Sequence, residues 1–233
     1  MKVLFINPPK TRVHGTGFIS ALVDLGIPLG TLQLASWLEK NKQKVAVIDC
    51  AGDQKAVPQR IGNNKIRFGI TAEDLIQRIK KFSPDLVGIS GQFIAQQDDV
   101  LWVSKIVKEI SPKVPVVVGG SVIYPEIYDV LKRESTLDIC AFGEGEETLL
   151  ELVKWVRGEI KLKDIKGIIY KNKGKVIKNE KRQWMFDIEK IPMPAYHLID
   201  MNHYLELPKK GFFYRLKDTK RSISLITSRG CPE

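Results

Sequence analysis

The chain has 233 residues, of which 43% are hydrophobic, and a formal net charge of +10 at pH 7. This length is enough for one full domain and part of a second one. The longest apolar runs are far shorter than the roughly 18 residues that a membrane helix needs, which excludes a membrane-spanning protein. The run at the N-terminus is interrupted by Asn7-Pro8-Pro9 before it could serve as a signal peptide, so we expect a cytoplasmic protein.

The cysteines and the charge distribution narrow the class further. Cys50, Cys140 and Cys231 are odd in number and far apart in the sequence, which favours reduced thiols over a disulfide framework. Residues 1–158 carry a surplus of +2 charges and residues 159–233 a surplus of +8. The lysines of the second part are scattered, without an interleaved aromatic ladder. This pattern favours a solvated surface over nucleic-acid binding.

The first two thirds of the chain alternate predicted strands with predicted helices. Residues 2–6 form an apolar run that ends in Asn7-Pro8-Pro9, which is typical of a central parallel strand followed by a loop. A long turn-rich loop is predicted over residues 10–26, and irregular structure over residues 51–70. Four further strands are expected at residues 45–49, 85–90, 114–118 and 137–142. Helices are expected at residues 29–41, 71–82, 100–110, 124–132 and 148–157.

Five strands that are each followed by a helix predict an α/β fold with a Rossmann-like, doubly wound sheet of five parallel strands. Residues 165–178 differ, because two short strands flank an Asn/Gly turn and predict a β-hairpin. We therefore divide the chain into a domain at residues 1–158, a hairpin linker at residues 159–190 and an incomplete further domain at residues 191–233. The last of these ends in a short β-branched strand that leads to Cys231.

Small or polar residues follow four of the five predicted strands. They include Asn7 and Pro8 after the first strand, Ser90 and Gly91 after the third, Gly119 and Gly120 after the fourth, and Gly143 after the fifth. The carboxyl ends of parallel strands meet at one edge of a sheet, where such folds bind ligands. Small residues there let a ligand approach the backbone closely, so the sequence predicts a ligand site at this edge.

Two familiar ligand classes do not match this pattern. Gly15-Thr16-Gly17 has Ser20 where the third glycine of a dinucleotide fingerprint would stand. Asp49 ends the second strand, where a ribose-binding acid would lie, and we interpret it as a loop or capping residue. A phosphorylated receiver domain would need acids at the ends of the first and third strands, where this chain has Asn7 and Ser90.

Three features remain open to two interpretations each. Gly143-Glu144-Gly145-Glu146 precedes a helix, whose N-terminus favours anions, but its glutamates can satisfy that helix end themselves. His14 could bind the cobalt of a corrin, although a solvated loop histidine is the commoner outcome. Cys231 alone cannot hold a metal cluster, which needs several thiolates.

Six motifs in this order resemble the cobalamin-dependent radical SAM enzymes, and the resemblance covers the whole chain. They are Asn7-Pro8-Pro9, Gly88-Ile89-Ser90, Val118-Gly119-Gly120, Phe142-Gly143-Glu144-Gly145-Glu146, Ile191-Pro192-Met193-Pro194-Ala195 and Ser228-Arg229-Gly230-Cys231-Pro232. The resemblance implies that residues 1–158 form the cobalamin-binding domain and that residues 191–233 begin the radical SAM domain.

The same resemblance implies a role for Cys231 as the first cysteine of the C-x-x-x-C-x-x-C motif. That motif holds a [4Fe-4S] cluster, which cleaves S-adenosylmethionine, and in this family cobalamin often serves as methyl donor. The other two cysteines are absent, so we expect an N-terminal fragment whose partner would be the missing radical SAM barrel of the same polypeptide. The fragment itself is expected to bind cobalamin and to lack the cluster chemistry.

By resemblance, the corrin and the dimethylbenzimidazole tail of cobalamin are held by the loops after strands one, three, four and five. The expected contacts are Asn7, Pro8, Ser90, Gly91, Gln92, Gly119, Gly120, Ser121, Gly143 and Glu144. Domains that supply a histidine to cobalt carry D-x-H-x-x-G, whereas this chain has Arg12 in place of the acid that would orient His14. We therefore expect no histidine on cobalt. The alternative is a cofactor-free, Rossmann-like interaction domain that has lost its pocket.

Overall fold

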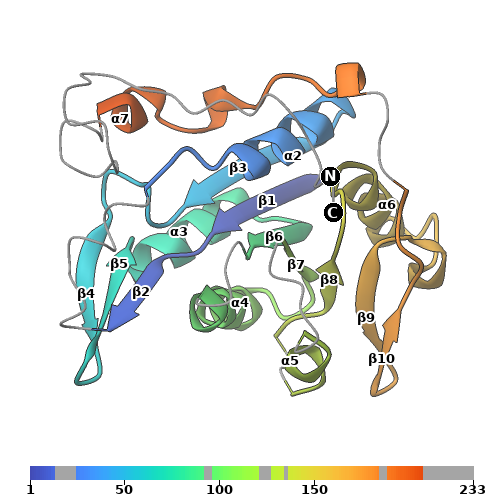
Figure 1. Ribbon diagram of the computed structural model, residues 1–233, viewed down its shortest axis with the longest axis horizontal. Helices are drawn as coiled ribbons and strands as arrows, with labels where there is room; N and C mark the ends of the chain where they lie inside the picture. Colours follow the sequence, from blue (N-terminus) through green and yellow to red (C-terminus); the bar gives the residue numbers. More distant parts are fainter. Residues whose placement is uncertain (14–24, 92–95, 121–126, 134–135, 184–187, 207–233) are drawn as a thin grey trace, which may run out of the picture.

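The computed structural model describes residues 1–13, 25–91, 96–120, 127–133, 136–183 and 188–206. A seven-stranded sheet in the order β10-β9-β8-β7-β6-β1-β3 forms its centre, and a separate three-stranded sheet has the order β2-β5-β4 (Figure 1). The strands of the main sheet are β1 (Lys2–Asn7), β3 (Lys44–Asp49), β6 (Leu86–Ser90), β7 (Val116–Gly119), β8 (Ile139–Ala141), β9 (Ile168–Asn172) and β10 (Lys175–Lys178).

Five strands of the main sheet, from β3 through β1, β6 and β7 to β8, are parallel to one another. The first of them along the chain lies between the second and the third, so the direction of winding reverses between β1 and β6. This is a doubly wound arrangement, and ligands bind such sheets at the reversal point, beyond the carboxyl ends of the strands. The predicted α/β fold with five parallel strands is confirmed.

Helices cover both faces of the sheet, and each parallel strand is followed by one of them, as predicted. They are α2 (Leu29–Lys40), α3 (Ala72–Phe82), α4 (Gln97–Ile110), α5 (Ile127–Arg133) and α6 (Glu146–Val156), with a short α7 (Met201–Glu206) near the end of the described chain. Residues of α3, α4 and α5 share one hydrophobic cluster with the sheet, and residues of α2 and α6 share another. The two clusters define an α3/α4/α5 face and an α2/α6 face.

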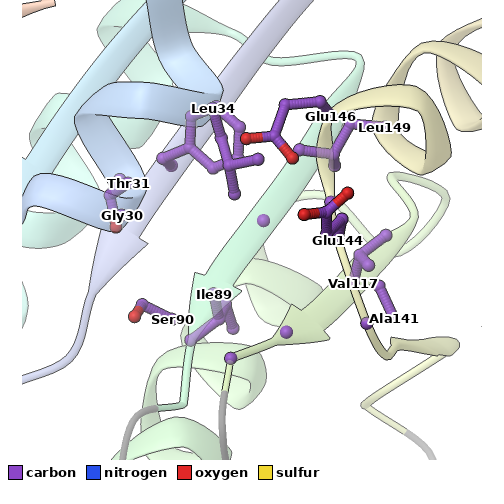
Figure 2. A pocket seen from close by; sticks show the side chains of 16 residues that line it. Gly30, Thr31, Leu34, Ile89, Ser90, Val117, Ala141, Glu144, Glu146 and Leu149 are labelled. Carbon is purple, nitrogen blue, oxygen red and sulfur yellow. The ribbon is translucent and has the colours of Figure 1, made fainter. Parts of the chain in front are cut away.

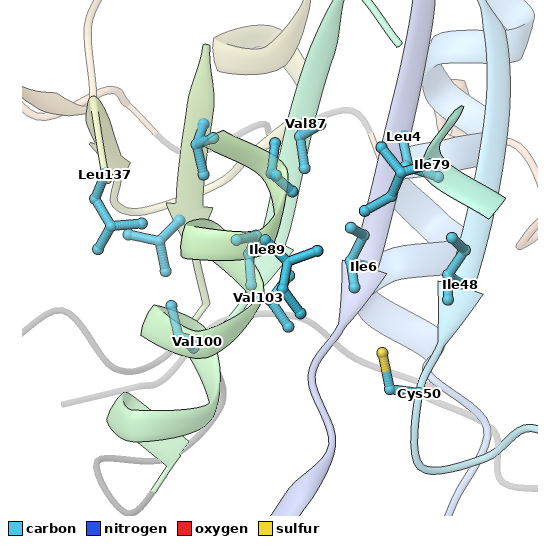
Figure 3. Close-up of a cluster of buried hydrophobic side chains, with 14 of the residues drawn as sticks. Leu4, Ile6, Ile48, Cys50, Ile79, Val87, Ile89, Val100, Val103 and Leu137 are labelled. Atoms are coloured by element: carbon cyan, nitrogen blue, oxygen red, sulfur yellow. The ribbon is translucent and has the colours of Figure 1, made fainter. Parts of the chain in front are cut away.

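Alternation along the strands assigns each side chain to one of these faces, because neighbouring residues of a strand point in opposite directions. Leu4 and Ile6 of β1 are fully buried toward the α3/α4/α5 face, together with Ile48, Val87 and Ile89 of the adjoining strands (Figure 3). Val3 and Phe5 point to the α2/α6 face. Both faces are apolar, which explains why the strands appear in the sequence as continuous apolar runs.

The predicted hairpin at residues 165–178 is present as β9 and β10. Its turn places Lys173 and Gly174 at φ values of 48° and 79°, the left-handed pair that a two-residue hairpin turn requires. β9 pairs antiparallel with β8, so the hairpin extends the main sheet at that edge. The division of the chain into domains at residues 158 and 190 stays a prediction.

The second sheet corrects two expectations of loop structure. Residues 10–13 form β2 (Lys10–Val13), and the segment expected to be irregular contains β4 (Val57–Ile61) and β5 (Lys65–Gly69). β5 pairs antiparallel with both other strands. These short strands are mostly half-exposed and polar, so local propensity does not reveal them. β4 and β5 form a local hairpin, whereas β2 pairs with β5 across more than fifty residues.

Residues 188–206 run along α2 and form what we call the α2 strap. The amide of Ala195 donates to the Leu32 carbonyl at 3.0 Å, and the Gln33 side chain donates to the Pro192 carbonyl at 2.6 Å. The strap ends in α7, where the Tyr204 hydroxyl donates to the carboxylate of Asp49 at 2.5 Å. Among the described residues, no helix is both long enough and apolar enough to span a membrane.

Candidate functional site

A cavity of about 520 Å³, which we call the slot, opens on the α2/α6 face toward the carboxyl edge of the sheet (Figure 2). Strands β1, β6, β7 and β8 contribute to it, with α2 on one side and the loop before α6 on the other. Its lining residues are Phe5, Gly30, Thr31, Leu34, Gly88, Ile89, Ser90, Val117, Gly119, Gly120, Ala141, Gly143, Glu144, Gly145, Glu146 and Leu149. A volume of this size suits a group as large as a nucleotide.

Two of the glycines that line the slot, one on β6 and one on α2, have different surroundings. Gly88 carries no side chain on β6, and a Cβ there would come within 2.8 Å of the Phe5 ring. On α2, a Cβ added to Gly30 would meet no heavy atom within 4 Å. The packing of the protein therefore does not require a glycine at Gly30, and a helical glycine costs stability relative to alanine. Gly30 is exposed and lines the slot.

A second, smaller cavity of about 120 Å³ adjoins the slot at the ends of β1, β3 and β6, and we call it the edge chamber. Its lining is more polar and includes Asn7, Lys10, Asp49 and Ser90. Ser90 lines both cavities. The Thr31 hydroxyl, on the slot side, donates to the Asn7 side-chain oxygen at 2.7 Å, so one hydrogen bond joins the walls of the two cavities.

The structure brings most of the predicted contact residues to these two cavities. Five of them line the slot, namely Ser90, Gly119, Gly120, Gly143 and Glu144. Asn7 and Pro8 line the edge chamber with Ser90. Gln92, Ser121, His14 and Cys231 lie outside the described residues. The roles of all these residues toward a cofactor or a cluster stay predictions.

Gly91 has a structural position behind the slot wall. It is buried, and its amide donates to the Gly119 carbonyl at 2.7 Å. Gly120 has a φ of 130°, and a Cβ there would come within 2.5 Å of the Gly91 carbonyl oxygen. The two turns after β6 and β7 therefore pack backbone against backbone. A side chain at Gly120 would disturb this contact whether or not a ligand binds.

Asp49 has the structural role expected of a loop or capping residue. Its carboxylate accepts hydrogen bonds from the Tyr204 hydroxyl at 2.5 Å and from the Gly52 amide at 3.2 Å. Burial raises the pKa of Asp49, although these hydrogen bonds and the positive charge of Lys10 partly oppose the rise. Burial and the negative charge of Asp49 also raise the pKa of Tyr204. The pair fastens the end of the α2 strap to the end of β3.

A second buried acid joins the small sheet to α4. Asp99 is fully buried and accepts hydrogen bonds from both the amide and the hydroxyl of Thr11, at 2.8 and 2.5 Å, and from Arg67 at 3.3 Å. Its pKa is raised by burial, which these partners oppose. Asp99 thus fixes β2, the strand that follows the Asn7-Pro8-Pro9 turn. Within the described ranges, no group of three or more His, Cys, Asp or Glu residues could hold a metal ion.

Sequence reasoning missed the contribution of α2 to the slot. Gly30, Thr31 and Leu34 form one of its sides, although the sequence indicated only an ordinary amphipathic helix there. A glycine in the first turn of a helix, directly after Pro28-Leu29, was an available signal, because it costs helix stability without serving a turn. Phe5 and Gly88 were missed as well, because their positions within strands indicate only a role in the core.

Comparison with known proteins gives a consistent family assignment. The family model described as the B12 binding domain matches residues 16–153. The chain is 32% identical to an uncharacterized methyltransferase of Pyrococcus horikoshii and 29% identical to the cytidylyl-2-hydroxyethylphosphonate methyltransferase of Streptomyces wedmorensis. These alignments cover 100% and 99% of this chain but only 44% and 46% of the relatives, so the chain spans less than half of their length.

Solved structures agree with this assignment at the level of the fold. The cobalamin-dependent S-adenosylmethionine radical enzyme OxsB, with aqua-cobalamin and S-adenosylmethionine bound, superposes with a TM-score of 0.65 at 22% identity, over 90% of this chain and 25% of that one. The radical S-adenosylmethionine methyltransferase TsrM of Kitasatospora setae, with cobalamin and a [4Fe-4S] cluster bound, gives a TM-score of 0.54 at 20% identity, over 77% and 30% of the two chains.

Proposed function

Because this chain belongs to the B12-binding domain family, we propose that it binds cobalamin and serves as the cobalamin-binding module of a longer B12-dependent radical SAM enzyme. The observation that carries the proposal is the open slot of about 520 Å³ at the point where the sheet reverses its winding. An interaction domain that had lost its ligand would be expected to fill this space with side chains.

The two cavities suit different parts of cobalamin. The slot is largely apolar, and we assign the nucleotide tail, which is smaller than the corrin ring, to its volume of about 520 Å³. We assign the dimethylbenzimidazole base to the apolar space between Phe5, Leu34 and Val117. The corrin would lie across the carboxyl edge, over the edge chamber and the glycine-rich turns after β7 and β8.

The contacts proposed for the cofactor follow from this placement. Gly119, Gly120 and Gly143 present backbone without side chains where the tail would enter the slot. Asn7, Pro8 and Ser90 would face the corrin from the edge chamber. Gly91 would act indirectly, by holding the Gly120 turn in place. Bound cobalamin would supply a cobalt centre that can carry a methyl group.

The α2 strap supports a role within a longer protein. It follows α2 from Lys40, whose ammonium group donates to the Lys190 carbonyl at 2.6 Å, to Asp49 at the carboxyl end of β3. The strap therefore reaches, through Tyr204, the edge at which we place the corrin. We propose that residues 191–233, which include most of this strap, begin the radical SAM domain. Its [4Fe-4S] cluster, with Cys231 as its first proposed ligand, and S-adenosylmethionine belong to this part of the proposal.

Titration with hydroxocobalamin tests the binding proposal. The purified chain is titrated while the visible absorbance of the corrin is followed, and bound and free cobalamin are separated by gel filtration. We expect a saturable spectral change with one cobalamin per chain. Cobalamin should elute together with the folded chain. A denatured control should show neither this co-elution nor the spectral change. A chain that retains its fold by circular dichroism but shows neither saturation nor co-elution would refute cobalamin binding.

A further inference from the structure

Two glutamates form one wall of the slot, although most of its lining is apolar. Glu144 follows the Gly143 turn after β8, and Glu146 opens α6. Glu144 is half-buried, and Glu146 is only 1% exposed. Figure 2 shows both carboxylates on the α6 side of the slot, with that of Glu146 directed toward Leu34 on α2. Ionised carboxylates are expensive to bury and accept hydrogen bonds without donating any.

The side chains across the slot from the glutamates are mostly apolar, and Ser90 adds one hydroxyl to the lining. Phe5, Leu34 and Val117 have no polar side-chain atoms, and the Thr31 hydroxyl already donates its hydrogen to Asn7 at 2.7 Å. The slot therefore combines apolar surfaces, which suit the faces of an aromatic ring, with acceptors at one edge. A planar base with N–H donors on its rim fits this combination.

We propose that the slot selects the lower base of a corrinoid, and that Glu144 favours an aminopurine base over dimethylbenzimidazole. The proposal rests on the proposed function, because it places the nucleotide tail in the slot. The exocyclic amine of an adenine base can donate to a carboxylate at the slot wall. Dimethylbenzimidazole has two methyl groups on its rim and no N–H donor, so it cannot donate a hydrogen bond to this carboxylate.

Affinities for two corrinoids, measured by isothermal titration calorimetry, test this selection. The probes are cobalamin and the corresponding cobamide with adenine as its lower base. Detaching the lower base from cobalt costs a different free energy in each corrinoid, but that cost is the same for every protein variant. We therefore compare the ratio of the two affinities between the wild-type chain and the variant Glu144→Met. The cost of detaching the base cancels in this comparison.

We expect the preference for the adenine cobamide to fall by about tenfold in Glu144→Met, the effect of one hydrogen bond to a charged group. Glu144→Gln, which keeps the shape without the charge, should fall between the two. Glu147→Met is the matched control, because Glu147 follows on α6 but does not line the described slot, and its ratio should equal that of the wild type. Cobinamide, which lacks the nucleotide, should bind wild type and Glu144→Met equally.

An unchanged ratio in Glu144→Met would overturn the proposal and would leave the glutamates with the role of satisfying the N-terminus of α6. The same holds if Glu147→Met shifts the ratio as much as Glu144→Met, because a general charge effect would then explain the shift. Failure of every corrinoid to bind the wild-type chain would instead refute the proposed function. The two failures are therefore distinguishable in one set of titrations.

Discussion

The two faces of the main sheet share their strands but differ in how they are filled. Toward α3, α4 and α5, large residues such as Ile6 and Ile89 pack tightly near the carboxyl edge (Figure 3). Toward α2 and α6, Gly88 and Ala141 occupy comparable places, and the slot of about 520 Å³ remains. Alternation along a strand lets side-chain size differ independently on the two faces. One face can therefore stabilise the fold while the other provides space for a ligand.

The largest expected effect on stability comes from the filled face. Ile6→Ala removes a fully buried side chain from the α3/α4/α5 face and should lower the free energy of unfolding by about 2–5 kcal/mol. Urea denaturation followed by circular dichroism measures this loss. Corrinoid affinity of the folded protein should stay unchanged. A loss below about 1 kcal/mol would show that the face is less tightly packed than the structure indicates.

A smaller effect concerns the acid that fastens the α2 strap. The folded pKa of Asp49 is raised by burial, so its contribution to stability is fully present below the unfolded pKa and is lost as pH rises toward the folded pKa. Each unit of difference between the two pKa values corresponds to about 1.4 kcal/mol. The wild type should therefore lose stability relative to Asp49→Asn as pH rises from about 4 to the folded pKa of Asp49. Above that pKa the difference between the two proteins should stay constant.

Urea unfolding of wild type and Asp49→Asn across a series of pH values measures this difference. Asp53→Asn is a useful comparison with the opposite sign. Partial burial acts to raise the pKa of Asp53, but its hydrogen bonds with Arg78, at 2.5 and 3.1 Å, prevail and lower it. Stability from Asp53 is thus lost as pH falls. A parallel pH dependence in the two variants would contradict the difference between the two acids.

The smallest expected effect on stability lies on the open face. Gly30→Ala should raise the free energy of unfolding by about 0.5–1 kcal/mol, because a helical glycine is replaced and the new Cβ meets no heavy atom within 4 Å. Thermal unfolding of the ligand-free chain measures the change. A destabilised variant would mean that the space beside Gly30 is smaller than described.

The sequence predicted the fold through signals that are local to each element. An apolar run of strand length, such as residues 2–6, predicts a buried strand. Apolar residues at helical spacing, as in residues 148–157, predict a helix, and the tertiary structure changed neither outcome. In the small sheet, β2 escaped prediction because it pairs with β5 across more than fifty residues, whereas the β4–β5 hairpin is local and was missed because its strands are short and largely polar. Their pairing depends on contacts such as Asp99 with Thr11, which no local pattern encodes.

The candidate site was predicted in part, for a related reason. Ser90, Gly119 and Gly143 follow strands, so topology alone brings them to one edge of the sheet. The slot itself depends on distances between separate elements, such as that between Leu34 on α2 and Gly145 before α6, where an added Cβ would come within 2.9 Å of the leucine. Single-sequence patterns contain no such distances, so the α2 side of the slot went unrecognised.

The variant Gly30→Leu shows whether the slot receives the nucleotide tail of cobalamin. Gly30 lines the slot, and a Cβ added there would meet no heavy atom within 4 Å, so we expect a leucine to fit and its side chain to reach the slot. Hydroxocobalamin and cobinamide, which has no tail, are titrated into wild type, Gly30→Ala and Gly30→Leu. We expect Gly30→Leu to keep its thermal stability and its affinity for cobinamide but to lose at least about 100-fold in affinity for cobalamin. Equal affinity of wild type and Gly30→Leu for cobalamin would contradict this expectation.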